Sequence, residues 1–267
     1  MSWLDALIMG LVQGLAEFLP ISSSGHLEIM NSILGLKLSG GDALEFDIAL
    51  HVATALSTIV ILWHEFSHLC SSFFRLKKDE NTQIVLKIIL SCIPVAIVGV
   101  CFEDYVESLF GGNILVVGIC LLVTAMLLAF THLMYIRRYD NIGRDITWLD
   151  ALIIGVAQAL AVLPGLSRSG ATISTGILLG DKRQQVAKFS FLMVLIPILG
   201  KAVLEVHEAL SAGSTSAVGF VPLLVGFLTA FIVGCLACKW MIRLVKNGKL
   251  YYFAIYCAIV GIVCLFF

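Results

Sequence analysis

Long apolar segments separated by short polar connections run through the whole chain. Six of them approach the roughly 20 residues that a helix needs to cross a bilayer. They are Phe46–Trp63, Ile84–Phe102, Ile114–His132, Val186–Val206, Val218–Cys238 and Leu250–Phe267. Two further apolar regions, Trp3–Leu36 and Trp148–Gly180, are each interrupted by a cluster of Pro, Gly and Ser. The pattern predicts an all-α polytopic membrane protein with six transmembrane helices and two broken regions.

Composition agrees with this class. Hydrophobic residues make up 60% of the 267 positions and the mean hydropathy is +1.02, whereas soluble domains are about 45–50% apolar. The alternating pattern of a membrane β-barrel is absent, and a net charge of −1 gives no sign of nucleic-acid binding. The eight cysteines lie mostly in apolar segments and are predicted to pack rather than to form disulfides. The first apolar segment lacks a basic leader, so we do not expect a cleaved signal peptide.

Lys and Arg gather in four connections, which the positive-inside rule places in the cytoplasm. These connections are Arg75–Lys78; Arg137, Arg138 and Arg144; Lys182, Arg183 and Lys188; and Lys239–Lys249. The connections around Glu103–Glu107 and Glu208–Ala217 carry neither residue and are predicted to lie outside. Each broken region then begins and ends on one side of the membrane. We therefore predict two re-entrant helical hairpins, with both chain termini outside.

The two broken regions are copies of one another. Trp3–Gly10 reads WLDALIMG and Trp148–Gly155 reads WLDALIIG, and a Gln, a Leu-Pro and a Ser-Gly follow at matching places. Each copy starts with Ser or Thr three residues before an Asp, which is a helix N-capping pattern. Three spans separate the copies, so they point in opposite directions. This is an inverted-topology repeat, a plan that places the site near the midplane, where broken helices meet.

The repeat sets the predicted domain organisation. We expect a single membrane domain over residues 1–267, with repeat one at 1–133 and repeat two at 148–267. A cytoplasmic connection at 134–147 joins them.

Both breaks carry polar side chains that are rare at membrane depth. They are Gln13, Glu17, Ser22, Ser23, Ser24 and His26 around the first, and Ser167, Arg168, Ser169 and Thr172 at the second. Ionisable groups at this depth are functional candidates. Helices that start after the breaks would direct N–H groups at an anion, phosphate above all, and Arg168 could hold two phosphate oxygens. Serines offer donors or a nucleophile, and Glu17 and His26 an acid, a base or a metal ligand. This combination in a membrane predicts a phosphorylated lipid as substrate.

The runs Gln13–His26 and Pro164–Thr172 resemble the two motifs of the undecaprenyl-diphosphatase family, the bacitracin-resistance type of integral membrane phosphatase. Arg183–Leu192 also resembles the family segment that follows, so the likeness covers nearly the whole chain. It implies removal of the terminal phosphate from undecaprenyl diphosphate, which recycles the carrier lipid for cell-wall synthesis and gives bacitracin resistance. It further implies a bacterial inner-membrane protein among membrane lipids, with a site open to the outer face.

The resemblance also implies residue roles. Glu17, Ser23, His26 and Arg168 would be catalytic, and Gln13, Ser22, Ser24, Gly165, Ser167, Ser169, Gly170 and Thr172 would bind substrate. A divalent cation, Mg²⁺ or Ca²⁺, is implied, with Glu17 as a ligand. Gln13 stands where many members have Glu, which leaves one carboxylate where two could bind metal, and Ala16 stands where Thr is usual. The nucleophile, Ser23 or His26, stays open.

The alternative function is a secondary transporter or a polyprenyl-phosphate flippase, since inverted repeats are typical of transporters. Transport needs binding groups but no nucleophile, acid or base, so the combination of Glu17, Ser23, His26 and Arg168 favours the enzyme. The two functions are not exclusive. The lipid chain length, the metal and the oligomeric state stay open, with a homodimer as one alternative.

Two histidine patterns elsewhere have simpler interpretations. His64–His68 matches the His-Glu-x-x-His pattern of zinc proteases. It follows Trp63 at the predicted cytoplasmic end of a span and has no evident third ligand, so we interpret it as a chance match. His51, one helical turn after Asp47, is predicted to be packed or hydrogen-bonded rather than a ligand.

Overall fold

The computed structural model describes residues 1–36, 40–102, 113–137, 143–212 and 218–266. Within these ranges the regular elements are helices, apart from one isolated bridge between Arg144 and Asp181. The helices are α1 (Trp3–Ala16), α2 (Ser23–Leu34), α3 (Gly40–Ile61), α4 (Trp63–Phe74), α5 (Glu80–Cys101), α7 (Ile114–Arg137), α8 (Trp148–Leu160), α9 (Arg168–Leu179), α10 (Arg183–Met193), α11 (Leu195–Ala212), α12 (Phe220–Lys246) and α13 (Tyr251–Cys264). The predicted all-α class is confirmed. The connection at 103–107 and residues 213–217 lie outside the described ranges.

Four stretches of the described chain are helices long and apolar enough to cross a membrane. They are Glu80–Cys101, Ile114–Met134, Arg183–Leu204 and Phe220–Lys246. A fifth results if α3 and α4 count as one span, although the chain bends by 87° between them. α13 is apolar but only 14 residues long. The polytopic class therefore holds, whereas six full spans stay a prediction.

Two predicted spans are divided in the structure. The predicted span Phe46–Trp63 ends earlier, because α3 stops at Ile61 and Trp63 already begins α4. The predicted span Val186–Val206 corresponds to the apolar stretch Arg183–Leu204, within which a turn at Val194 separates α10 from α11.

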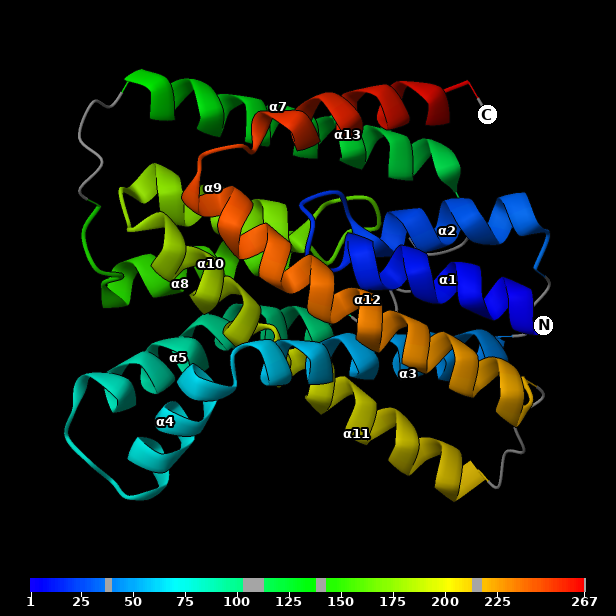
Figure 1. Ribbon diagram of the computed structural model, residues 1–267, viewed down its shortest axis with the longest axis horizontal. Helices are drawn as coiled ribbons and strands as arrows, with labels where there is room; N and C mark the ends of the chain where they lie inside the picture. The colour runs from blue at the N-terminus through cyan, green and yellow to red at the C-terminus, as the bar shows by residue number, and fades with distance from the viewer. Residues whose placement is uncertain (37–39, 103–112, 138–142, 213–217, 267) are drawn as a thin grey trace.

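The two broken regions enter from opposite ends of the molecule and meet in its middle. In Figure 1 the pair α1–α2 lies to the right and the pair α8–α9 to the left, with α7 and α13 side by side above them. α1 packs along α12 and α8 packs along α5, so each broken helix rests on a span of the other half. A Cβ on Gly10 would meet the backbone of Gly226, and one on Gly155 would meet that of Ser91. Small residues thus let both pairs approach closely.

The repeated sequence also builds the same helix starts. Ser2 Oγ accepts a hydrogen bond from the Asp5 backbone N–H, while the Asp5 carboxylate accepts one from Ser2 N–H. Thr147 and Asp150 form the same reciprocal pair before α8. Such capping boxes satisfy N–H groups that a helix start leaves free. The predicted capping pattern is therefore confirmed in both copies.

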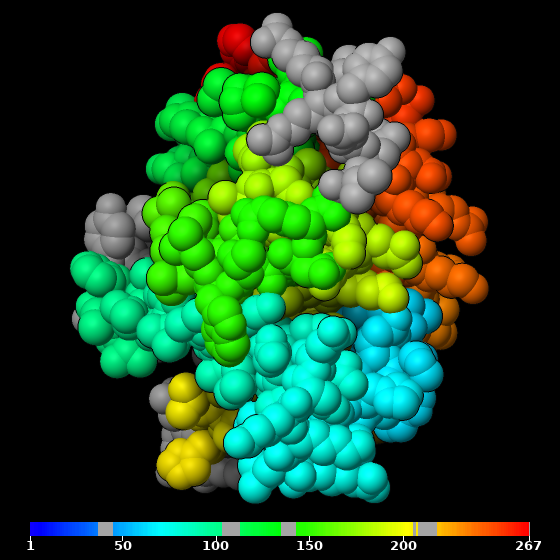
Figure 2. Space-filling model, turned by 90° about the vertical axis from the view of Figure 1, so that its left-hand side faces the viewer, coloured from blue at the N-terminus to red at the C-terminus, as the bar shows by residue number. Residues whose placement is uncertain are grey.

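α4 marks one end of the molecule. Figure 2 looks onto this end, where α4 (cyan) projects at the bottom and residues near 150 (green) lie in the middle. Around the helices many large apolar side chains stay exposed, including Ile97, Met126, Val203 and Leu236. An apolar exterior of this extent suits a lipid environment, where burial between helices is not driven by water.

Candidate active site

The two helix breaks touch each other directly. Ser169 Oγ, from the second break, donates a hydrogen bond to the backbone carbonyl of Leu19, in the first, at 3.2 Å. A Cβ placed on Gly25 would lie 2.9 Å from the Cα of Gly165. Gly165 itself has φ +90°, which favours glycine. Residues that are about 150 positions apart in the sequence therefore share one site.

Each break ends in the same cap. Ser22 Oγ accepts a hydrogen bond from Gly25 N–H at 3.3 Å, and Ser167 Oγ accepts one from Gly170 N–H at 3.0 Å. Ser22 adopts φ 71°, an unusual conformation for a residue other than glycine. Backbone outliers of this kind gather at functional sites when the surrounding structure holds them. The two caps make Ser23 and Arg168 the first residues of α2 and α9.

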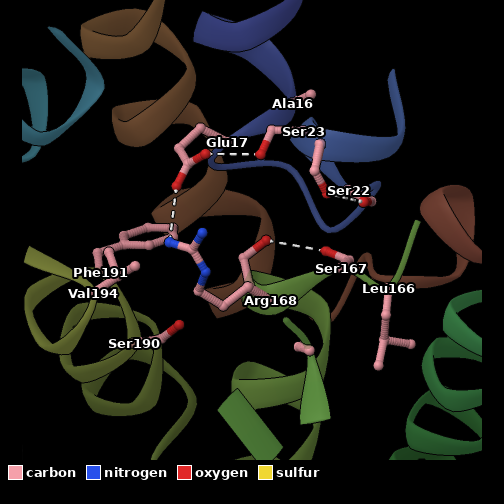
Figure 3. A pocket seen from close by; sticks show the side chains of 13 residues that line it. Ala16, Glu17, Ser22, Ser23, Leu166, Ser167, Arg168, Ser190, Phe191 and Val194 are labelled. Carbon is pink, nitrogen blue, oxygen red and sulfur yellow. Dashed lines mark hydrogen bonds and ion pairs between the residues drawn. The ribbon is translucent and has the colours of Figure 1, made fainter. Parts of the chain in front are cut away.

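Glu17 joins the two halves of the site (Figure 3). Its Oε1 lies 3.3 Å from Arg168 Nη1, from the other repeat. Its Oε2 accepts hydrogen bonds from Ser23 Oγ at 2.8 Å and from Gln13 Nε2 at 3.1 Å. The carboxylate side chain is only 8% exposed, and a buried charge requires partners of this kind. The fold thus assembles a carboxylate, a hydroxyl and a guanidinium in one place.

These three side chains lie in a pocket between the breaks and α10. It is lined by Ala16, Glu17, Ser22, Ser23, Ser24, Ala161, Leu166, Ser167, Arg168, Ser169, Ser190, Phe191 and Val194. Hydroxyls and charges cluster around Glu17, while Leu166, Phe191 and Val194 add apolar surface (Figure 3). A pocket lined by both polar and apolar side chains suits an amphiphile with an anionic head.

His26 makes its contacts with groups other than Glu17 and Arg168. Its Nδ1 donates to the backbone carbonyl of Ser22 at 2.8 Å, and its Nε2 lies 2.8 Å from the hydroxyl of Tyr256. The two rings also stack, with centroids 5.6 Å apart. His26 does not line the pocket, so its two ring nitrogens serve the turn at Ser22 and the contact with α13.

The remaining predicted substrate-binding residues divide into two groups. Ser22, Ser24, Ser167 and Ser169 line the pocket, whereas Gln13, Gly165, Gly170 and Thr172 are not among its lining residues. Thr172 Oγ1 donates to the backbone carbonyl of Arg168 at 2.9 Å and lies 2.6 Å from Ser190 Oγ. Thr172 therefore supports the start of α9 rather than the pocket surface.

Sequence reasoning did not assign several residues to the site. Ser190 of α10 lines the pocket, and its place in the family-like segment Arg183–Leu192 was the available signal. His51 is hydrogen-bonded as predicted, since Nδ1 donates to the carbonyl of Asp47 at 2.8 Å. Its Nε2, however, lies 3.8 Å from Glu17 Oε2, a neighbourhood that the prediction did not foresee. An ionisable residue inside a span was the available signal.

The donors around Glu17 fit a divalent cation in part. Among the described residues no three His, Cys, Asp or Glu side chains gather as ligands. Glu17 and His51 make two, whereas the buried Gln13 turns its Nε2 donor toward Glu17 Oε2. A carboxylate and an imidazole are metal ligands, but an amide N–H donor is not. A cation there would add positive charge next to a bound anion.

The His64–His68 pattern lies elsewhere, on α4. Its Glu65 forms an ion pair with Lys188 of α10. His64 and His68 are exposed, with ring centroids 4.5 Å apart.

Known proteins match the chain along nearly its whole length. It is 52% identical over 265 residues to a protein of Bacteroides thetaiotaomicron named undecaprenyl-diphosphatase, covering 98% of this chain and 97% of the relative. Proteins of the same name from Bacteroides fragilis and Christiangramia forsetii are 52% and 48% identical, with 98% and 97% of the two chains covered in each case. The family model described as bacitracin resistance protein BacA matches residues 6–263. The chain belongs to this family.

Proposed function

We propose that this protein is a membrane phosphatase that hydrolyses undecaprenyl diphosphate to undecaprenyl phosphate and inorganic phosphate. The observation that carries the proposal is the contact of Ser23, Glu17 and Arg168 at the polar part of an amphiphilic pocket. The name shared by the relatives supports the substrate. Hydrolysis of this kind would recycle the carrier lipid for cell-wall synthesis and give bacitracin resistance.

In the proposed reaction Ser23 Oγ attacks the terminal phosphorus. Its proton passes to Glu17 Oε2, which already accepts its hydrogen bond at 2.8 Å. The bond from this phosphorus to the bridging oxygen breaks, and undecaprenyl phosphate leaves with that oxygen. Water then hydrolyses the phosphoserine and releases inorganic phosphate. Splitting one difficult displacement into two steps is the usual role of a covalent nucleophile.

Arg168 and the two helix starts would stabilise the phosphoryl group. The guanidinium lies beside Glu17 Oε1 at 3.3 Å, and it can hold two phosphate oxygens once substrate enters. The N-termini of α2 and α9 carry partial positive charge. In phosphoryl transfer, positioning and charge stabilisation supply most of the catalysis.

We assign the nucleophile to Ser23 and a positioning role to His26. Ser23 lines the pocket and contacts a carboxylate, whereas both nitrogens of His26 are engaged by Ser22 and Tyr256. His26 holds the turn that contains the strained Ser22. Its loss is therefore expected to misplace Ser23.

A topology of six spans and two re-entrant hairpins, with both termini outside, goes with this function. The basic connections lie toward the end of the molecule shown in Figure 2. The helix ends that border them are the last residues of α4 and α12 and the first residues of α8 and α10. This arrangement supports a cytoplasmic assignment for that end. We further propose that the protein resides in the bacterial inner membrane and that the pocket opens to the outer face.

Phosphate release tests the proposal. The detergent-solubilised protein is incubated with undecaprenyl diphosphate and a divalent cation, and inorganic phosphate and the lipid product are measured. We expect stoichiometric release of both, and a Glu17→Gln variant that binds the lipid without turnover. Lipid binding by the wild type with no phosphate release would overturn the phosphatase and would favour the transporter.

A further inference from the structure

Helix α4 leaves the bundle almost at a right angle. α3 ends at Ile61, and α4 begins at Trp63 after a bend of 87°. Figure 1 shows α4 running across the direction of α3 and α5. Spans lie within about 40° of the bilayer normal, so a helix perpendicular to a span lies near the membrane plane. With 12 residues, α4 is also shorter than the roughly 20 residues that a crossing needs.

Contacts with the rest of the protein fix the direction of α4. Leu69 is buried in the hydrophobic core. Glu65 forms an ion pair with Lys188 of α10. Near the other end, Ser72 Oγ donates a hydrogen bond to the Asp79 carboxylate at 2.8 Å. The fold therefore holds α4 in one orientation along the end of the molecule.

The part of α4 that the protein leaves uncovered has an apolar side and a polar side. Trp63 and Phe74, about three turns apart, share one side and are 62% and 79% exposed. His64 and His68, about one turn apart, share the neighbouring side and are exposed. Helices with this division lie in the membrane interface, where Trp is also enriched.

Leu76 extends the apolar side beyond the helix. It is 84% exposed and has φ 51°, a conformation that bulky residues rarely adopt and that glycine usually supplies after a helix. Its N–H donates to the carbonyl of Phe73 at 3.0 Å, which closes the end of α4. In water the exposed side chain does not offset this strain. Among acyl chains, its removal from water does.

Three exposed basic side chains surround this apolar tip: Arg75, Lys77 and Lys78. Of the two acids that follow, Asp79 is engaged by Ser72 Oγ and by the backbone N–H of Thr82, which leaves Glu80. Positive charge next to exposed apolar side chains is complementary to a leaflet of anionic phospholipids, with phosphate head groups above acyl chains.

We propose that α4 lies in the interface of the membrane and binds anionic phospholipids. Trp63, Phe74 and Leu76 enter the acyl chains, while the three basic side chains bind the phosphate head groups and His64 and His68 face water. This surface goes beyond the proposed phosphatase and does not depend on it.

The test uses the full-length protein with Trp63 as its only tryptophan, after Trp3→Phe, Trp148→Phe and Trp240→Phe. It is reconstituted into vesicles of phosphatidylcholine and phosphatidylglycerol, one of which carries bromine on its acyl chains. Bromine quenches tryptophan fluorescence on contact. We expect quenching by both lipids and a preference for phosphatidylglycerol. Lys77→Gln together with Lys78→Gln should lower this preference by up to about fivefold for each charge removed.

A second reporter measures the direction of α4. In this variant Trp63→Phe and Phe74→Trp move the single tryptophan to the other end of the helix. A helix in the membrane plane places positions 63 and 74 at the same depth, whereas a helix that crosses would separate them by about 16 Å. With lipids brominated at different places along the chain, we expect both positions to be quenched most by bromine near the head group.

Trp3 is the matched control. It is 59% exposed at the start of α1, and residues 1–36 contain no Lys or Arg. As the only tryptophan, Trp3 should show no preference for phosphatidylglycerol.

Three results would each overturn the proposal. Unquenched Trp63 would place α4 in water, and different depths at positions 63 and 74 would make α4 part of a broken span. A preference for phosphatidylglycerol that is absent at Trp63, or equal at Trp63 and Trp3, would exclude a lipid site on α4. No substrate is present, so these results are distinct from failure of the phosphatase.

Discussion

Ser23 and Ser24 are neighbouring hydroxyls with different partners. Ser23 Oγ donates to Glu17 at 2.8 Å, whereas Ser24 Oγ lies 3.4 Å from Ser22 Oγ. Ser23→Ala removes the proposed nucleophile and should lower kcat by at least about 10²-fold, a loss typical for one catalytic group. Ser24→Ala is the matched control and should cost far less. Steady-state phosphate release measures kcat for both variants. Equal losses of kcat would show that Ser23 is not the nucleophile.

Substitutions of Arg168 can distinguish the contribution of its positive charge from that of its planar geometry. Its guanidinium is a planar fork, while the ammonium of lysine is a compact point charge. If the fork holds the phosphoryl group most tightly in the transition state, Arg168→Lys should lower kcat as well as affinity, and Arg168→Ala should be worse. Kinetics on the solubilised enzyme measure both. A lysine variant with wild-type kcat and KM would mean that Arg168 does not contact the substrate.

At the scale of elements, the contact between the breaks depends on Gly165. This residue has φ +90°, and a Cβ there would lie 2.5 Å from the carbonyl oxygen of Val117 on α7. Gly165→Ala should therefore destabilise the fold by about 1–3 kcal/mol. The control is Gly200→Ala on α11, where a Cβ would meet nothing within 4 Å. Alanine should stabilise that helix by up to about 1 kcal/mol. Thermal unfolding in detergent measures Tm for both variants. Equal changes in Tm would contradict the close contact between Gly165 and Val117.

Arg144 joins the two ends of the second broken region. Its guanidinium contacts the Asp150 carboxylate at 2.7 Å, at the start of α8, and lies 4.0 Å from Asp181, after α9. Its backbone N–H also donates to the carbonyl of Gly180 at 3.1 Å. Burial raises the pKa of Asp181 from 3.8 to about 6; the negative charge of Asp150 adds to the rise and Arg144 opposes it.

This pKa predicts a pH dependence of stability. Between pH 3.8 and about 6 the folded protein holds a proton on Asp181 that the unfolded chain releases. Stability from this group therefore falls as the pH rises through that window. Asp181→Asn should reduce the fall in Tm between about pH 4.5 and pH 6. Asp145→Asn is the control, because the pKa of Asp145 is lowered by Lys182 and the group stays ionised throughout. A fall in Tm as steep in Asp181→Asn as in the wild type would refute the assignment.

At the scale of the whole molecule, the topology can be tested by cysteine labelling. In a cysteine-free background, single cysteines replace Ser2 and Lys77, which the proposed topology puts on opposite sides of the membrane. An impermeant reagent should label position 2 in intact cells and position 77 only after the membrane is opened. Labelling of position 77 in intact cells would overturn the orientation.

The helical membrane class, the two broken regions, their caps and the polar residues of the pocket could be predicted from the amino-acid sequence. These features depend on local physics: span length, hydrogen bonds within a few residues of a helix start, and the repeat of one string. The repeat predicted that the two breaks meet, but only the structure shows that Arg168 pairs with Glu17. It also shows that His51 of α3 lies near the same carboxylate and that His26 contacts Tyr256. Such contacts depend on how helices from opposite repeats pack. Small residues such as Gly10 and Gly155 permit this packing, but the sequence does not indicate which helix packs against them.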